Sequence, residues 1–119
     1  MNSMARALSV GVHLLMNIYD IPDIDILKDL SKGRPILDDI VRELKLTVVS
    51  QTGYQFEPMG YTYAYVLSES HFTIHTYPEY RSCYIDIFCC NPEFNCVYAN
   101  NYIKNMFNTT NGSYQVIHR

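Results

Sequence analysis

The segment 68–79, SESHFTIHTYPE, concentrates serine, histidine and glutamate side chains in a short stretch. Serine becomes a nucleophile when a base activates it, and histidine is the residue that most often acts as that base. Phe72 and Ile74 alternate with His71 and His75, a pattern typical of a half-buried strand. We therefore expect one strand that presents two histidines on a single face.

Two common chemistries fit this segment poorly. A metal bound by His71 and His75 would need a third ligand such as Cys90 or Glu79, and no known metal motif has this spacing, so we expect no metal. A serine hydrolase built on Ser70 would need a G-x-S-x-G elbow and an orienting acid, and neither is evident. Cys90 by itself would be a small buried apolar residue.

Alternating and apolar runs predict the strands that must position these side chains. Gly53, Gly60 and Pro78 separate neighbouring runs, and such short connections favour antiparallel pairing. The expected strands are Leu8 to Tyr19, Leu46 to Gln51, Tyr61 to Leu67, His71 to Thr76, Ser82 to Cys89 and Tyr114 to His118.

Helical spacing of apolar residues appears in two regions between these strands. The order β-α-β-β-β-β-α-β predicts an α+β fold: a two-layer sandwich whose mainly antiparallel sheet carries helices on one face. The expected helices run from Pro22 to a break at Ser31 to Gly33, from Pro35 to near Leu46, and from Phe94 to Met106.

Length and composition narrow the class of protein further. The 119 residues suit a single domain, 1–119. A net charge of −3 without a basic stripe argues against a nucleic-acid partner. The apolar stretch 7–18 is too short to span a bilayer and lacks a cleavage signal, and the four cysteines form no C-x-x-C pair. We expect a cytoplasmic protein with free thiols and no membrane contact.

A longer segment, Phe56 to Cys90, reads FEPMGYTYAYVLSESHFTIHTYPEYRSCYIDIFCC and resembles the S-adenosylmethionine decarboxylase family of the small prokaryotic type. Members of that family carry F-x-P-x-G, then a strand ending in E-S-H, then I-H-T-W-P-E, then D-x-F-x-C, with the intervals found here. The segment GVHLL, residues 11–15, is similar to the first strand of the family. The resemblance covers most of the chain and is weaker at residues 20–45 and after Cys90.

The resemblance implies that the chain cleaves itself between Glu69 and Ser70, giving fragments 1–69 and 70–119. Ser70 Oγ would attack the Glu69 carbonyl, and β-elimination of the resulting ester would leave a pyruvoyl group at position 70. His75 matches the base of the family, and Thr62 stands where the family has a serine that helps processing. Five residues of straight strand span roughly 16 Å. We therefore expect a turn after Ser70, with a strand that bends or starts later than His71.

The same resemblance implies a substrate and its contacts. The pyruvoyl group would form a Schiff base with S-adenosylmethionine and accept electrons as carbon dioxide leaves, with no metal and no pyridoxal phosphate. Cys90 matches the proton donor, Glu79 the residue that binds the ribose hydroxyls, and Phe56 an aromatic near the adenine. The product would be the aminopropyl donor for spermidine synthesis, made by a homodimer of processed protomers with sites near the interface.

Several positions depart from the family pattern and leave the local loop shape open. Tyr77 replaces a tryptophan, Tyr54 a histidine and Cys89 a common threonine, while Arg81 and Asn91 replace glycines. Two alternatives therefore stay open: a pyruvoyl-dependent decarboxylase of arginine or ornithine, and an unprocessed regulatory partner of an active relative. Loss of nucleoside contacts would indicate the first. Loss of Ser70, His75 or Cys90 would indicate the second.

Overall fold

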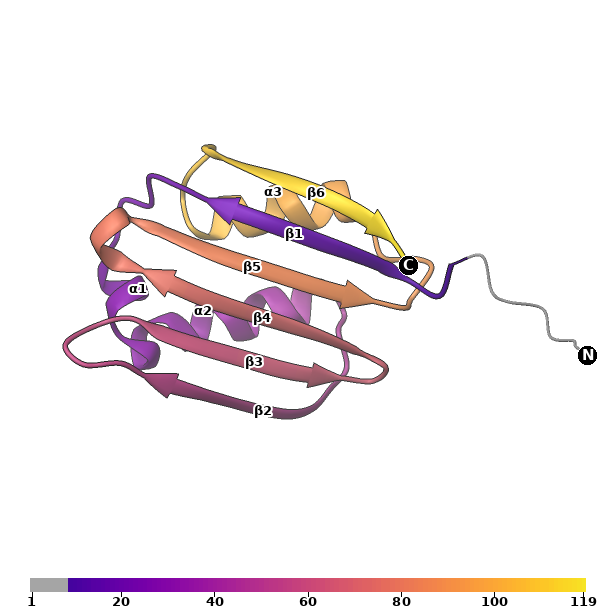
Figure 1. The fold of residues 1–119 in the computed structure, drawn as a ribbon, viewed down its shortest axis with the longest axis horizontal. Helices are drawn as coiled ribbons and strands as arrows, with labels where there is room; N and C mark the ends of the chain where they lie inside the picture. The colour runs from indigo at the N-terminus through magenta and orange to yellow at the C-terminus, as the bar shows by residue number, and fades with distance from the viewer. Residues whose placement is uncertain (1–8) are drawn as a thin grey trace, which may run out of the picture.

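A computed structural model describes residues 9–119, which form one six-stranded antiparallel sheet in the order β2-β3-β4-β5-β1-β6. All the helices lie on the same side of this sheet (Figure 1). The strands are β1 (Val12–Ile18), β2 (Val48–Gln55), β3 (Tyr61–Leu67), β4 (Ser70–Tyr77), β5 (Ser82–Cys89) and β6 (Gly112–His118). The helices are α1 (Asp25–Lys28), α2 (Leu30–Glu43), α3 (Cys96–Met106) and the 3-10 turn η1 (Pro78–Tyr80). The predicted α+β class is confirmed.

The core lies between the sheet and the helices. Strand residues alternate between the two faces of a sheet, so every second residue of β1, β3, β4 and β5 is buried against α2 and α3. The residues between them form the open face, which no helix covers. The open face of the four inner strands carries His13, Leu15, Asn17, Thr62, Ala64, Val66, His71, Thr73, His75, Tyr77, Tyr84, Asp86 and Phe88.

The helical region differs from the prediction at one point. The chain breaks at Asp29, whose extended backbone ends α1 and whose side chain caps α2 by accepting from the Ser31 backbone N–H. From there α2 runs unbroken through the predicted break and through Pro35. Gly33 does not interrupt the helix. A Cβ at this position would overlap the Tyr61 hydroxyl, so the glycine allows α2 to pack closely against β3.

The β3–β4 hairpin contradicts the expected bend after Ser70. Leu67 pairs with Ser70, so Ser68 and Glu69 are the two turn residues, and Glu69 adopts a left-handed backbone with φ 61°. β4 begins at Ser70 and continues without a bend, because it pairs with β3 on one side and β5 on the other. These two ladders keep the strand straight as far as His75.

Other boundaries shift modestly. β1 begins at Val12, and Leu8, where the first strand was expected to start, lies outside the described residues. α3 begins at Cys96 because Asn95 caps it, its side chain accepting from the Tyr98 backbone N–H. Between residues 9 and 119, no helix is long and apolar enough to cross a membrane.

Candidate active site

Three of the predicted site residues meet where the β3–β4 turn approaches the end of β5. The backbone N–H of Cys90 donates to Ser70 Oγ at 3.1 Å, and the Cys90 thiol donates to the Glu69 carbonyl oxygen at 3.1 Å. Cys90 thus contacts both the Ser70 nucleophile and the Glu69 carbonyl that Ser70 would attack. We call Glu69, Ser70 and Cys90 the cleavage end.

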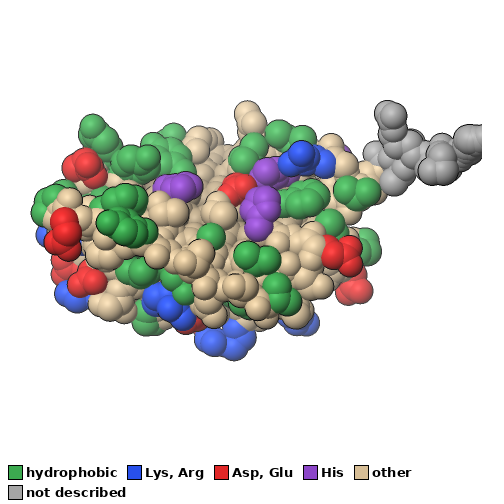
Figure 2. Space-filling model, turned by 60° about the horizontal axis from the view of Figure 1, so that its bottom comes forward, with side chains coloured by type: hydrophobic (Ala, Val, Ile, Leu, Met, Phe, Trp, Pro, Cys, Tyr) green, Lys and Arg blue, Asp and Glu red, His purple; other side chains and the backbone are tan. Residues whose placement is uncertain are grey.

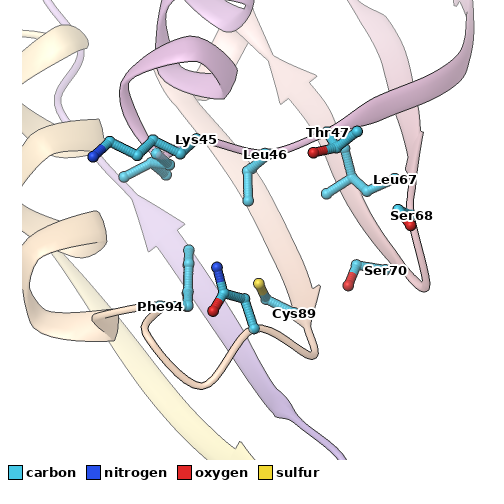
Figure 3. Close-up of a pocket in the computed structure, with 10 residues that line it drawn as sticks. Lys45, Leu46, Thr47, Leu67, Ser68, Ser70, Cys89 and Phe94 are labelled. Atoms are coloured by element: carbon cyan, nitrogen blue, oxygen red, sulfur yellow. The ribbon is translucent and has the colours of Figure 1, made fainter.

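Ser70 borders a small cavity on the helix side of the sheet. The cavity has a volume of about 100 Å³, and Figure 3 shows Ser70 and Cys89 on one side of it, with Leu46 and Thr47 across from them. Cys89 is buried, and burial raises the pKa of its thiol. Cys89 therefore stays protonated and packs in the core, whereas Cys90 is turned toward the turn backbone.

The remaining predicted residues form a second group at the opposite end of the hairpin. Phe56, Thr62, His75 and Glu79 line one hollow of about 360 Å³ beside η1. Thr62 pairs with His75 across the β3–β4 ladder, and Thr62 Oγ1 lies 2.8 Å from His75 Nδ1. The hydroxyl therefore orients the imidazole. We call these four residues the binding end.

The aromatic departures from the family pattern cluster near the binding end. The Tyr54 ring meets the Phe56 ring edge-on at a centroid distance of 5.0 Å. The Tyr77 ring meets Tyr84 in the same way at 5.5 Å. These contacts fix ring orientations around the hollow.

Arg81 keeps the conformation that a glycine would supply. Its φ of 50° is left-handed, and its guanidinium donates to the carbonyls of Ile21 and Pro22 at 3.3 and 3.0 Å. Because these bonds tie the loop after η1 to the loop after β1, the turn at the binding end keeps its shape without a glycine.

The two ends do not meet within one chain. Ser70 and His75 belong to the same straight strand, so about 16 Å separates them along it. Their side chains also leave opposite faces, since Ser70 borders the helix-side cavity and His75 lies on the open face. The expectation that His75 folds back onto Ser70 is therefore wrong for a single chain.

Sequence reasoning missed a third group, formed around Asp86. His13 Nε2 and His71 Nε2 lie 2.7 and 3.0 Å from Asp86 Oδ2, and Thr73 donates to the other carboxylate oxygen. Partial burial opposes ionisation of Asp86, but these hydrogen bonds outweigh it and lower its pKa. His71 thus pairs with residues of two other strands and not with His75. The sequence does carry a signal for this group, because Asp86 is the one acidic residue within the otherwise apolar strand segment YIDIF.

Comparison with known proteins gives one consistent result. The family model described as S-adenosylmethionine decarboxylase matches residues 12–119. The S-adenosylmethionine decarboxylase proenzyme of Picrophilus torridus is 33% identical over 111 residues, which cover 93% of this chain and 85% of that protein. The proenzyme of the same name from Hydrogenobaculum sp. is 35% identical over 115 residues, covering 95% and 84%.

A solved structure is also similar. The crystal structure of the adenosylmethionine decarboxylase from Aquifex aeolicus superposes with a TM-score of 0.84 at 31% identity, covering 95% of this chain and 92% of the other. Similarity in sequence and in fold therefore extends over almost the same residues.

Proposed function

This chain belongs to the S-adenosylmethionine decarboxylase family, and we propose that it is a self-cleaving, pyruvoyl-dependent decarboxylase of S-adenosylmethionine whose pyruvoyl group comes from Ser70. One observation carries the proposal for this chain: Cys90 holds both Ser70 Oγ and the Glu69 carbonyl through hydrogen bonds. If Glu69 and Ser70 served only to close the β3–β4 hairpin, neither of these hydrogen bonds from Cys90 would be needed.

Self-cleavage begins with attack of Ser70 Oγ on the Glu69 carbonyl carbon. Negative charge then develops on the carbonyl oxygen, where the Cys90 thiol donates a hydrogen bond. The peptide C–N bond breaks, the acyl group moves to Oγ, and the amine of residue 70 becomes free. The left-handed Glu69 lies at a hairpin turn, where the break removes no rung of the β3–β4 ladder.

A base completes the conversion by removing the α-proton of residue 70. The ester then leaves as the Glu69 carboxylate, and the dehydroalanine that remains takes up water and releases ammonia. The products are chain 1–69 and a pyruvoyl-capped chain 70–119 of one folded domain. The family assigns the base to His75, whose imidazole Thr62 orients.

We propose that His75 acts on Ser70 of a second copy, because the two residues are too far apart within one chain. A twofold dimer that joins the binding end of each copy to the cleavage end of the other makes two complete sites. The open face supports this arrangement. It exposes apolar side chains, with Val66 49% and Tyr77 42% accessible, that a second copy would cover.

The binding end suits a nucleoside substrate. The exposed Phe56 ring offers a face for adenine, and the Glu79 carboxylate accepts hydrogen bonds from two ribose hydroxyls. The pyruvoyl carbonyl, once bonded to the substrate amine, accepts the electron pair released with carbon dioxide. Cys90, next to residue 70, then delivers a proton. These nucleoside contacts favour S-adenosylmethionine over arginine or ornithine.

The product of this reaction is the aminopropyl donor for spermidine synthesis.

The state of the cysteines bears on the location of the protein. The four cysteines are all free thiols: Cys83, Cys89, Cys90 and Cys96. Free thiols persist in a reducing compartment, and we therefore propose a cytoplasmic location.

Intact mass and substrate choice test the proposal together. Purified protein should separate into fragments 1–69 and 70–119, the second lighter than a serine-started chain by one ammonia, and Ser70→Ala should stay uncut. The cleaved enzyme should release carbon dioxide from S-adenosylmethionine much faster than from arginine or ornithine. A lasting intact chain contradicts self-cleavage, while equal rates on arginine contradict the substrate.

A further inference from the structure

The Asp86 group lies on the open face of the sheet, whereas Ser70 borders the cavity on the helix side, and the proposed reaction uses no member of the group. We propose that His13, His71 and Asp86 form a binding site for a divalent transition-metal ion of the zinc class. The two Nε2 atoms and one carboxylate oxygen lie within 4.8 Å of one another, which is close to the spacing of three ligands that share one metal ion. Figure 2 shows histidines gathered beside an acidic side chain on the molecular surface.

The sheet register brings these three side chains together. β5 lies between β1 and β4, and both His13 and His71 pair with Phe88. Each imidazole leans toward Asp86, two residues from Phe88 on the same face. Because hydrogen-bonded ladders hold all three strands, the ligand set is assembled before any ion binds.

The donor chemistry matches a zinc-class ion. Two imidazole nitrogens and one carboxylate oxygen are ligands that zinc prefers, and three protein ligands leave a position for water. Zinc at about 2.0–2.2 Å from each ligand places the ligands somewhat over 3 Å apart. The two distances from a histidine nitrogen to the Asp86 oxygen, 2.7 and 3.0 Å, therefore need only a small widening by side-chain torsion. The Thr73 hydroxyl on the second oxygen is the type of outer hydrogen bond that orients a ligating carboxylate.

Within a single chain, solvent reaches the group from the open face, so an ion can bind before a second copy covers that face. The side chains of His13, Asp86 and His71 are 16, 26 and 40% exposed.

Arg119 disfavours binding of the ion at His13, and this effect provides a further variant for the test. Its guanidinium nitrogen lies 3.3 Å from His13 Nδ1, and arginine can only donate. Nδ1 therefore accepts, and Nε2 carries the proton that points at Asp86. An ion replaces that proton, which then moves to Nδ1 and faces the guanidinium. Removing Arg119 should thus strengthen binding.

Cobalt(II) is the probe, titrated into metal-free, self-cleaved enzyme and followed by visible absorption. We expect about one ion per chain, bound without the near-ultraviolet sulfur-to-cobalt charge transfer that cysteine ligands would cause. His13→Ala and His71→Ala should each weaken binding at least tenfold, and Arg119→Ala should strengthen it severalfold. His118→Ala, which removes an exposed histidine of β6 that is not a member of the group, is the matched control and should bind as the parent does.

Zinc competition and melting temperature give a second readout. Zinc should displace cobalt and raise the melting temperature of the parent but not of His71→Ala. His71 is the most exposed of the three, so its removal spares the core. Three results overturn the proposal: no ion bound, equal binding by the parent and His71→Ala, or a sulfur band abolished by Cys90→Ser. If no ion binds, His13, His71 and Asp86 form a hydrogen-bond network only.

Discussion

The thiol of Cys90 lies 3.1 Å from the carbonyl oxygen of Glu69, while the backbone N–H of the same cysteine reaches Ser70 Oγ. One residue therefore contacts both partners of the bond that self-cleavage forms. Under the proposed function, Cys90 takes part twice: it polarises the carbonyl before cleavage and supplies a proton during turnover.

Cys90→Ala should affect these two steps unequally. Cleavage after Glu69 should slow by about tenfold, because one neutral hydrogen bond is lost while the backbone N–H contact remains. Carbon dioxide release by the cleaved variant should fall by about 10²–10⁴-fold, because positioned proton transfer is lost. Mass spectrometry follows the first and radiolabelled carbon dioxide the second.

The neighbouring cysteine is the matched control. Cys89 points to the opposite face of the sheet end, so Cys89→Ala should retain both cleavage and turnover. A dead Cys89→Ala with a fully active Cys90→Ala would reverse the assignment. Alanine at position 70 after turnover by Cys90→Ala, detected by mass, would show that the proton reached the wrong carbon.

Mixed dimers test whether His75 serves the other copy. Ser70→Ala and His75→Ala should each fail to cleave when expressed alone. When the two are co-expressed with distinguishable tags, the His75→Ala chain should be cut, since it keeps Ser70 and receives His75 from its partner. The Ser70→Ala chain should stay intact. If neither chain is cut in the purified mixed dimer, the base does not come from the second copy.

Glu79→Gln should weaken substrate use without affecting cleavage, because Glu79 lines the binding end and does not touch Ser70. A hydrogen bond to a charged group contributes about 1.5–3 kcal/mol, so kcat/KM for S-adenosylmethionine should fall about tenfold to a hundredfold. Steady-state kinetics measure the loss, and fragment masses check the cleavage. An unchanged kcat/KM would remove Glu79 from the ribose contact.

Asp86 should make stability depend on pH in the acid range. Hydrogen bonds lower its pKa in the folded state, so its contribution is complete above the ordinary carboxyl pKa of about 3.9 and declines as pH falls toward the folded value. The difference in unfolding free energy between the parent and Asp86→Asn should therefore shrink between pH 5 and pH 3, as measured by urea denaturation. A difference that grows on acidification would contradict the lowered pKa.

Local pattern was sufficient for much of the fold. Alternation in segments such as Tyr61–Leu67 and Ser82–Cys89 identified these strands at their observed bounds. The helix break was misplaced, because Gly33 is a weak helix former in isolation, and only its packing against Tyr61 shows that the glycine serves close contact. In the structure, Asp29 caps the helix that begins at Leu30.

The sequence by itself determined the residue types of the site and the strand on which each of them lies, because side-chain chemistry and the two-residue period of a strand are local properties. Only the tertiary structure decided which of them meet. Register across β1, β5 and β4 joins His13, Asp86 and His71, which lie far apart in the chain. The same ladders hold β4 straight and keep Ser70 from His75, because hydrogen bonds on both sides of a strand outweigh any local tendency to turn.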